Sequence, residues 1–169
     1  MGKLMRSNKK YREKDAVKNV INYVTRHNSR KSDEDLIGYG GCGVSSDDPD
    51  KMCQQMQQVQ SAYDLKEGKR QIFQTTYSMS REEVAAMGDD KETLLEYASD
   101  CAEHYFRMGH QVVYAVHKNQ EGDGTGAYLH IHFAVCSVGY EDGRMYNESF
   151  RVNDANERMF DKYQKKYRV

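Results

Sequence analysis

Three histidines in the second half of the chain have the type and spacing of metal ligands. His130 and His132 alternate with apolar residues in "YLHIHFAVCSV", residues 128–138, and His117 ends a similar run, "HQVVYAVH", residues 110–117. Neutral imidazole is the commonest metal ligand, and three imidazoles leave coordination positions open for water or substrate. A cation held in this way is a Lewis acid for a phosphoryl or carbonyl oxygen. The competing interpretation is that the histidines only line a solvated sheet face.

The alternation in both runs predicts strands that carry the histidines on one face. Side chains alternate along a strand, so His130 and His132 share a face, and His117 shares one with Val113 and Ala115. The short polar connection between the runs predicts an antiparallel hairpin, because a parallel return needs a longer crossover. Pairing of His117 near His132 would bring the three imidazoles together, since cross-strand neighbours lie about 5 Å apart.

The remaining patterns predict the elements that position these strands. Residues 15–27 have a helical apolar stripe, and Tyr23 falls on its flank. Residues 28–50 are glycine-rich and predict a loop, 70–77 predict a strand, and a capping box at Ser80 and Glu83 predicts a helix start. A turn and short strand follow residue 138, and a helix is expected over 154–169. The fold class is therefore α+β: a central, mostly antiparallel sheet carrying the HxH strand and flanked by helices, in one domain spanning 1–169.

The charge distribution is asymmetric although the net charge is only −1. Residues 1–31 contain ten Lys and Arg against two acidic residues, a sum of +8, so the other 138 residues sum to −9. A basic segment on an acidic body is typical of polyanion binding, although it also serves solubility alone. The chain shows no membrane-length apolar run and no signal-peptide pattern, and its four cysteines form no CxxC pair. We therefore expect reduced thiols and a cytoplasmic protein.

Several motifs in a common order resemble the relaxase/mobilisation nuclease family, whose members are HUH-type enzymes that nick DNA at a transfer origin. The segment "AVH…YLHIHFAVCSV" resembles the histidine motif of that family, and "VINYVTR", residues 20–26, resembles its tyrosine motif. "GYGGCGVSSDDPDKMCQQMQQVQ", "RQIFQTTYSMSREE" and "SVGYEDGRMYNE" are similar to the segments found between and after these motifs. The resemblance spans roughly residues 15–150, so the chain is either a minimal member or the nuclease domain of a longer protein.

The resemblance implies a specific chemistry and specific residues. Tyr23 would attack a scissile phosphate of single-stranded DNA, forming a 5′-phosphotyrosine and a free 3′-hydroxyl. His117, His130 and His132 would hold a divalent cation, with Mg²⁺ or Mn²⁺ expected and Zn²⁺, Ni²⁺ or Co²⁺ as alternatives. The residues expected to contact the DNA backbone are the basic ones around the tyrosine, namely Lys9, Lys10, Arg26, Arg30 and Lys31.

Other roles remain as candidates. Tyr39, Tyr63, Phe73, Tyr77 and Tyr146 are candidate base-stacking residues. Asp100 and Glu103 are candidates for the carboxylate that activates Tyr23. The expected partners are single-stranded DNA at a transfer origin, accessory DNA-binding proteins and a coupling protein.

Three other functions remain open at this point. A replication-initiating HUH nuclease would use Tyr163 or Tyr167, on a helix after the histidine strand. A non-catalytic DNA-binding accessory protein is compatible with Asn119 and Cys136, which replace an aspartate and an asparagine of the family pattern. A zinc hydrolase of a small substrate would need neither DNA nor Tyr23.

Overall fold

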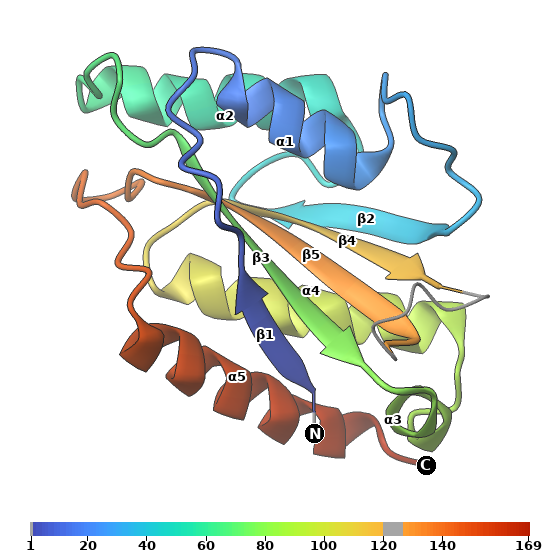
Figure 1. The fold of residues 1–169 in the computed structure, drawn as a ribbon. Helices are drawn as coiled ribbons and strands as arrows, with labels where there is room; N and C mark the ends of the chain where they lie inside the picture. The colour runs from blue at the N-terminus through green and yellow to red at the C-terminus, as the bar shows by residue number, and fades with distance from the viewer. Residues whose placement is uncertain (1, 120–126) are drawn as a thin grey trace.

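The computed structural model describes residues 2–119 and 127–169, which form a five-stranded sheet with helices on both faces (Figure 1). The strands run in the order β1-β3-β5-β4-β2, and every pairing is antiparallel. The expected fold class is thereby confirmed. The elements are β1 (Lys3–Arg6), α1 (Ala16–Thr25), β2 (Leu36–Cys42), α2 (Pro49–Ala62), β3 (Ile72–Met79), α3 (Arg81–Ala86), α4 (Lys91–Arg107), β4 (Val112–Lys118), β5 (Leu129–Cys136), α5 (Phe150–Gln164) and the short 3₁₀ helix η1 (Lys165–Tyr167).

The two faces of the sheet are covered to different extents. Helices α4 and α5 cover one face and build the larger core, in which the large side chains of β5, such as Ile131 and Phe133, are fully buried (Figure 1). Helices α1 and α2 lie on the other face and build a second, smaller apolar cluster. Among the described helices, none is long and apolar enough to cross a membrane.

Two helices agree with the sequence patterns that predicted them. The stripe of α1 buries Val17, Val20, Ile21 and Val24, whose spacing is that of one helical face. Ser80 and Glu83 form the capping box that starts α3, because each side chain accepts a hydrogen bond from the other residue's main chain. The helix that begins there, α3, ends at Ala86, and a separate helix, α4, begins at Lys91.

Both edge strands were missed by the sequence patterns. The expected loop over 28–50 contains β2, and the basic N-terminal segment contains β1, which pairs with β3. The glycines of β2 let other side chains pack on its backbone: a Cβ at Gly38 would lie 2.9 Å from Leu95 Cδ2. In contrast, the short strand expected after residue 138 is only an isolated bridge between Val138 and Met145.

Candidate active site

The face under α1 and α2 changes from apolar to polar partway along its strands. Ile72, Val113, Ala115, Ala134 and Cys136 belong to the apolar cluster beneath the two helices. Further along the same strands the positions on this face are His117, His130 and His132, together with Thr76 and Ser78 of β3. The end of α1 covers His117 but not the whole of this part, so the alternation of the strands brings all three imidazoles to a polar patch beside the end of α1.

The hairpin register brings the three histidines together, although not in the pairing first expected. His117 lies opposite His130, whereas His132 lies opposite Ala115. The ring centroids of His117 and His132 are nevertheless only 4.5 Å apart, and those of His130 and His132 are 6.2 Å apart. The diagonal contact is therefore the closer one, and the convergence predicted from the sequence is present.

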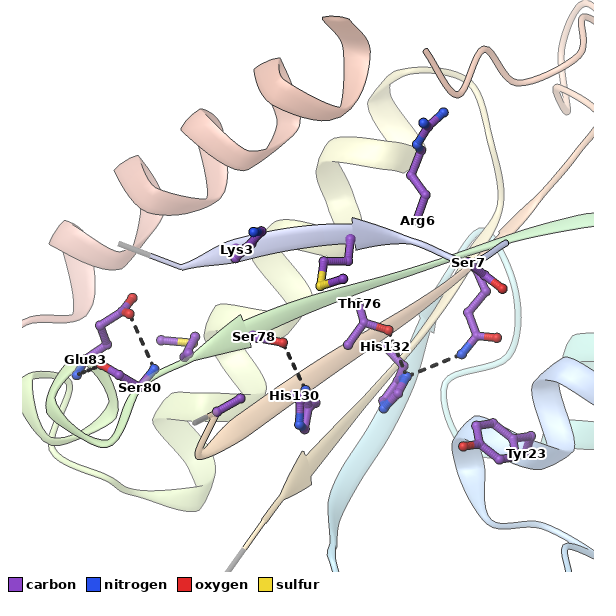
Figure 2. Close-up of a pocket in the computed structure, with 14 residues that line it drawn as sticks. Lys3, Arg6, Ser7, Tyr23, Thr76, Ser78, Ser80, Glu83, His130 and His132 are labelled. Atoms are coloured by element: carbon purple, nitrogen blue, oxygen red, sulfur yellow. Dashed lines mark hydrogen bonds between the residues drawn. The ribbon is translucent and has the colours of Figure 1, made fainter. Parts of the chain in front are cut away.

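Hydroxyl groups of β3 orient two of the rings. Ser78 Oγ lies 3.0 Å from Nδ1 of His130, its cross-strand partner, and Thr76 Oγ1 lies 3.3 Å from Nδ1 of His132 (Figure 2). Gln74 Nε2 lies 3.4 Å from the same atom of His132. A hydroxyl can accept a hydrogen bond from Nδ1–H, which favours the tautomer whose lone pair is on Nε2.

The third ring, His117, is held by the end of α1. Its Nε2 donates to the main-chain oxygen of Val24 at 2.7 Å, and its Nδ1 lies 3.1 Å from Nη2 of Arg26. Burial lowers the pKa of His117 to about 4, so the ring is neutral at pH 7. Burial, reinforced by the neighbouring His117 and His130, also lowers the pKa of His132 well below its ordinary value.

The donor chemistry of this patch fits a divalent cation, with one qualification from the geometry. Two of the rings are oriented through Nδ1 and two are kept neutral by burial, which suits metal ligation. Within residues 2–119 and 127–169, however, no three potential ligands are arranged as a metal site. Both nitrogens of His117 are engaged, Nε2 by Val24 of α1 and Nδ1 by Arg26, which caps this helix. Coordination by His117 would require it to exchange either its contact with Arg26 at Nδ1 or its bond to Val24 at Nε2.

Tyr23 stands at the border of the histidine patch. Its side chain is 39% exposed on the flank of α1, and its ring meets the ring of His132 edge-on at 6.5 Å between centroids. The guanidinium carbon of Arg26 lies 5.2 Å from the Tyr23 ring centroid, and Nζ of Lys31 lies 5.5 Å from it. The tyrosine singled out in the sequence is thus next to the three histidines and is flanked by two cations.

The carboxylate nearest to this site is Asp35, which the sequence analysis missed. Its Oδ2 lies 3.0 Å from Nη2 of Arg26 and 3.9 Å from Nδ1 of His117. Partial burial raises its pKa, but the hydrogen bond from Arg26 and the charges of His117 and Arg26 outweigh that, and the pKa lies below its ordinary value. The candidates Asp100 and Glu103 were wrong, because both lie on α4, beneath the opposite face.

Cavities adjoin the histidine patch on either side. One, of about 550 Å³, extends over β3 to the edge strand β1 and is bordered by Lys3, Met5 and Arg6 (Figure 2). A second, of about 620 Å³, extends toward β2 and is bordered by Lys31, Asp35 and His117. Both include Tyr23, Thr76, His130 and His132, so these four residues lie where the two cavities meet.

The five predicted DNA-contacting residues have different environments. Lys9 borders a further cavity of about 620 Å³ that also reaches Tyr23, and Lys31 borders the one beside His117. Lys10 and Arg30 are exposed. Arg26 differs, since its side chain is only 6% exposed and its guanidinium group is bound to Asp35 and to the main-chain oxygen of Tyr23.

The candidate aromatic residues are mostly unsuited to stacking with bases. Phe73, Tyr77 and Tyr146 are buried in the larger core, so that interpretation was wrong for them. Tyr63 is exposed, but its hydroxyl donates to the main-chain oxygen of Glu141. Tyr39 is half-buried on β2.

The tyrosines that a replication initiator would use are remote from the histidines. Tyr163 and Tyr167 pack against the larger core, with hydroxyls on Arg107 and Asp100 of α4. They lie on the face of the sheet opposite to the histidine patch.

Comparisons with known proteins agree with this geometry. Two solved structures of the conjugative relaxase TrwC in complex with oriT DNA share the fold. The metal-bound structure has a TM-score of 0.58 and 12% sequence identity, and the match covers 99% of this chain and 69% of the solved TrwC chain. The metal-free structure has a TM-score of 0.52 and 11% sequence identity, and the match covers 99% of this chain and 68% of the solved TrwC chain. No curated protein sequence matches significantly. Residues 23–169 match the family model described as "Relaxase: MobA/VirD2-like, nuclease domain", from Tyr23 through all three histidines. The chain thus belongs to the MobA/VirD2-like relaxase nuclease-domain family and is a DNA relaxase.

Proposed function

We propose that this relaxase nicks one DNA strand at a transfer origin of a plasmid or integrative element and transfers the strand through a 5′-phosphotyrosine on Tyr23. The observation that carries the proposal is the position of Tyr23, partly exposed and edge-on to His132 at the border of the histidine patch. The similar TrwC structures contain oriT DNA, which supports the same class of substrate here.

The reaction is a transesterification in which the number of phosphodiester bonds is conserved. The Tyr23 hydroxyl loses its proton as its oxygen bonds to phosphorus, and the bond from phosphorus to the 3′-oxygen breaks. The leaving 3′-oxygen takes up a proton and becomes a free 3′-hydroxyl. Because the phosphotyrosine bond retains the bond energy, a 3′-hydroxyl can later attack it and rejoin the strand.

The histidine patch is the part of the site that would hold a divalent cation. His117, His130 and His132 would be the ligands, with Ser78 and Thr76 fixing the orientation of the latter two rings through Nδ1. A bound cation would polarise the scissile phosphate and neutralise charge on its oxygens. Imidazole ligands suit Mn²⁺, Zn²⁺, Ni²⁺ or Co²⁺, and Mg²⁺ is the alternative that prefers more oxygen ligands.

The arrangement of the cavities supports an extended single strand as the substrate. A phosphate at the junction near His132 would have room for nucleotides on both sides, toward β1 and toward β2. Lys31 on one side and Lys3 on the other supply positive charge for backbone phosphates. Accessory proteins that melt the duplex and a coupling protein are the partners such a reaction needs.

Covalent capture tests the proposal. The protein is incubated with Mn²⁺ or Mg²⁺ and single-stranded DNA pooled from transfer origins of mobilisable elements, then treated with denaturing detergent and mapped by peptide mass spectrometry. We expect a nucleotide adduct on Tyr23 that a chelator prevents and that Tyr23→Phe abolishes, whereas Tyr163→Phe retains it. An undiminished adduct in Tyr23→Phe, or an adduct on Tyr163 or Tyr167, would refute the assignment of the nucleophile.

The same experiment addresses the non-catalytic alternative. A DNA-binding accessory protein would bind single strands tightly and give no adduct with any of the cations. That result, obtained with metal binding verified and a cognate origin in the pool, would replace our proposal by a binding function.

A further inference from the structure

Phe150, at the first position of α5, is an exposed aromatic residue outside the histidine patch. Its side chain is 74% exposed, more than any other large apolar residue of the described chain except the terminal Val169. The guanidinium carbon of Arg6 lies 4.1 Å from the ring centroid of Phe150. One side of the ring is therefore covered by a cation, and much of its surface remains accessible to solvent.

The cation that lies on Phe150 is held in a fixed place. Arg6 Nη1 donates to the main-chain oxygen of Glu148 at 2.7 Å, and its Nε lies 3.9 Å from the carboxylate of the same residue. The Glu148 side chain is only 7% exposed and lies 3.7 Å from Arg70, whose guanidinium carbon is 4.0 Å from the Phe73 ring centroid. Because these contacts already order Arg6, little conformational entropy remains to be lost when a planar ligand stacks here.

The charge around Phe150 favours a polyanion. The single carboxylate of Glu148 faces Arg6 and Arg70, and the charge of Lys10 also acts on it. Arg70 also donates to the main-chain oxygen of Lys9, so the backbone of the basic N-terminal segment passes this region. The three cations Arg6, Arg70 and Lys10 against the one anion Glu148 leave a net charge of +2 on these four residues.

This region is continuous with the cavity that contains the proposed nucleophile. Met5 and Arg6 both border the cavity of about 550 Å³ that includes Tyr23 and His132. Met5 is 56% exposed and lies opposite Thr76, whose side chain contacts His132, so Met5 is on the face of the histidines. Successive side chains of β1 point to opposite faces, and Arg6 lies beyond β1 on the side away from Tyr23 (Figure 2). A strand that leaves the cavity across this edge reaches Phe150.

We propose that Phe150, backed by Arg6, is a stacking platform for an unpaired base of the DNA strand that is cleaved at Tyr23. This inference rests on the proposed function for the identity of the strand, but its own site is separate from the chemistry. Stacking on an aromatic ring is tolerant of base identity, because every base has a π-face. The platform thus anchors a single strand at a distance from the scissile phosphate, without reading its sequence.

A tryptophan reporter tests the platform directly, because the chain contains no tryptophan. Phe150→Trp places the only indole at the platform, and Tyr63→Trp places one at an exposed aromatic position on the C-cap of α2. Each protein is titrated with oligo-dT of 20 nucleotides. We expect the fluorescence of Phe150→Trp to be quenched on binding and that of Tyr63→Trp to change little.

Affinity supplies the second readout. Base stacking on an aromatic residue accounts for about fivefold to a hundredfold in affinity per base. Phe150→Ala should therefore weaken oligo-dT binding by about fivefold or more, whereas Phe150→Trp should retain wild-type binding. Circular dichroism of both variants should match the wild type, since the side chain is exposed.

Several outcomes would overturn the inference. These are equal quenching in the two tryptophan proteins, equal quenching by duplex DNA, quenching by self-association without DNA, or binding by Phe150→Ala within twofold of the wild type. The Tyr23 adduct is scored separately: an adduct without quenching rejects only the platform, and quenching without an adduct rejects only the nuclease chemistry.

Discussion

Replacement of Arg26 should uncouple Tyr23 and His117 from the sheet. The Arg26 guanidinium group donates to the main-chain oxygen of Tyr23 at 2.8 Å, lies 3.1 Å from His117 Nδ1 and contacts both carboxylate oxygens of Asp35 at 3.0 and 3.4 Å. With a side chain only 6% exposed, it is a buried connector between the end of α1, β4 and the segment before β2. Its removal affects three partners at once.

The magnitude follows from what each partner loses. A buried polar atom left without a partner costs about 1–3 kcal/mol, and this applies to His117 Nδ1. The Asp35 side chain is 40% exposed, so solvent screens its ion pair with Arg26, and loss of this pair should lower stability by about 1 kcal/mol at most. The oxygen of Tyr23 at the helix end can bind water instead. Arg26→Ala should therefore destabilise the protein by about 1–4 kcal/mol.

A glycine at the same position is the matched control. Arg26 caps α1 in the left-handed conformation at φ 62°, which costs a non-glycine residue roughly 1–2 kcal/mol. Arg26→Gly removes the same side chain but relieves that cost, so it should be more stable than Arg26→Ala by about 1 kcal/mol. Adduct formation should fall in both variants alike, because Tyr23 and His117 lose the same contacts.

Urea unfolding gives the stabilities, and a double-mutant cycle with Asp35→Ala isolates the pair. We expect a coupling energy of about 0.5–1 kcal/mol between Arg26 and Asp35. The reasoning would be refuted if Arg26→Ala were as stable as the wild type, or if full adduct formation survived in both Arg26 variants.

Three other perturbations have defined expected results. Gly41→Ala should lower the free energy of unfolding, measured in urea, by about 1–3 kcal/mol, because the new Cβ would lie 2.6 Å from the main-chain oxygen of Ser45. Unchanged stability would contradict the close packing of β2. Ser78→Ala removes the 3.0 Å contact to His130 Nδ1 and should weaken the affinity for Mn²⁺, measured by calorimetry, about tenfold or more while the fold stays intact. An equal affinity would argue that the hydroxyl does not orient the His130 ring. Burial lowers the pKa of His110, so the unfolded chain binds this proton more tightly and the protein should lose stability as the pH falls below about 6.5. His110→Gln should reduce the slope of the urea midpoint against pH, measured in chelator, and leave the part of the slope that His117 and His132 contribute.

The centre of the sheet could be predicted from the sequence because its strands are paired on both sides. β3, β4 and β5 each bury one face in the larger core, so their alternating apolar residues are required along most of their length. The edge strands lack this constraint. β1 has only four residues, and β2 has three glycines among seven, where neighbouring side chains rather than its own fill the space. Neither pattern distinguishes a strand from a loop.

The residues of the candidate active site also differ in whether they could be predicted from the sequence. His130 and His132 share a face by strand periodicity alone, and one hairpin adds His117, so three candidate ligands could be placed with no knowledge of the remaining fold. Arg26 and Asp35 could not, because their contact depends on a left-handed helix end and on the path of the chain before β2. Arg26 contacts Nδ1 of His117, and Asp35 lies 3.9 Å from the same atom, whereas Nε2 of His117 is bound to Val24 of α1. Residues that strand periodicity does not reveal therefore hold His117, the candidate ligand that must change its contacts before a cation can bind. Asp35→Ala loosens Arg26 and should for this reason raise the affinity of the protein for Mn²⁺. A decrease in that affinity would mean that Asp35 orients His117 for the metal instead of holding it away.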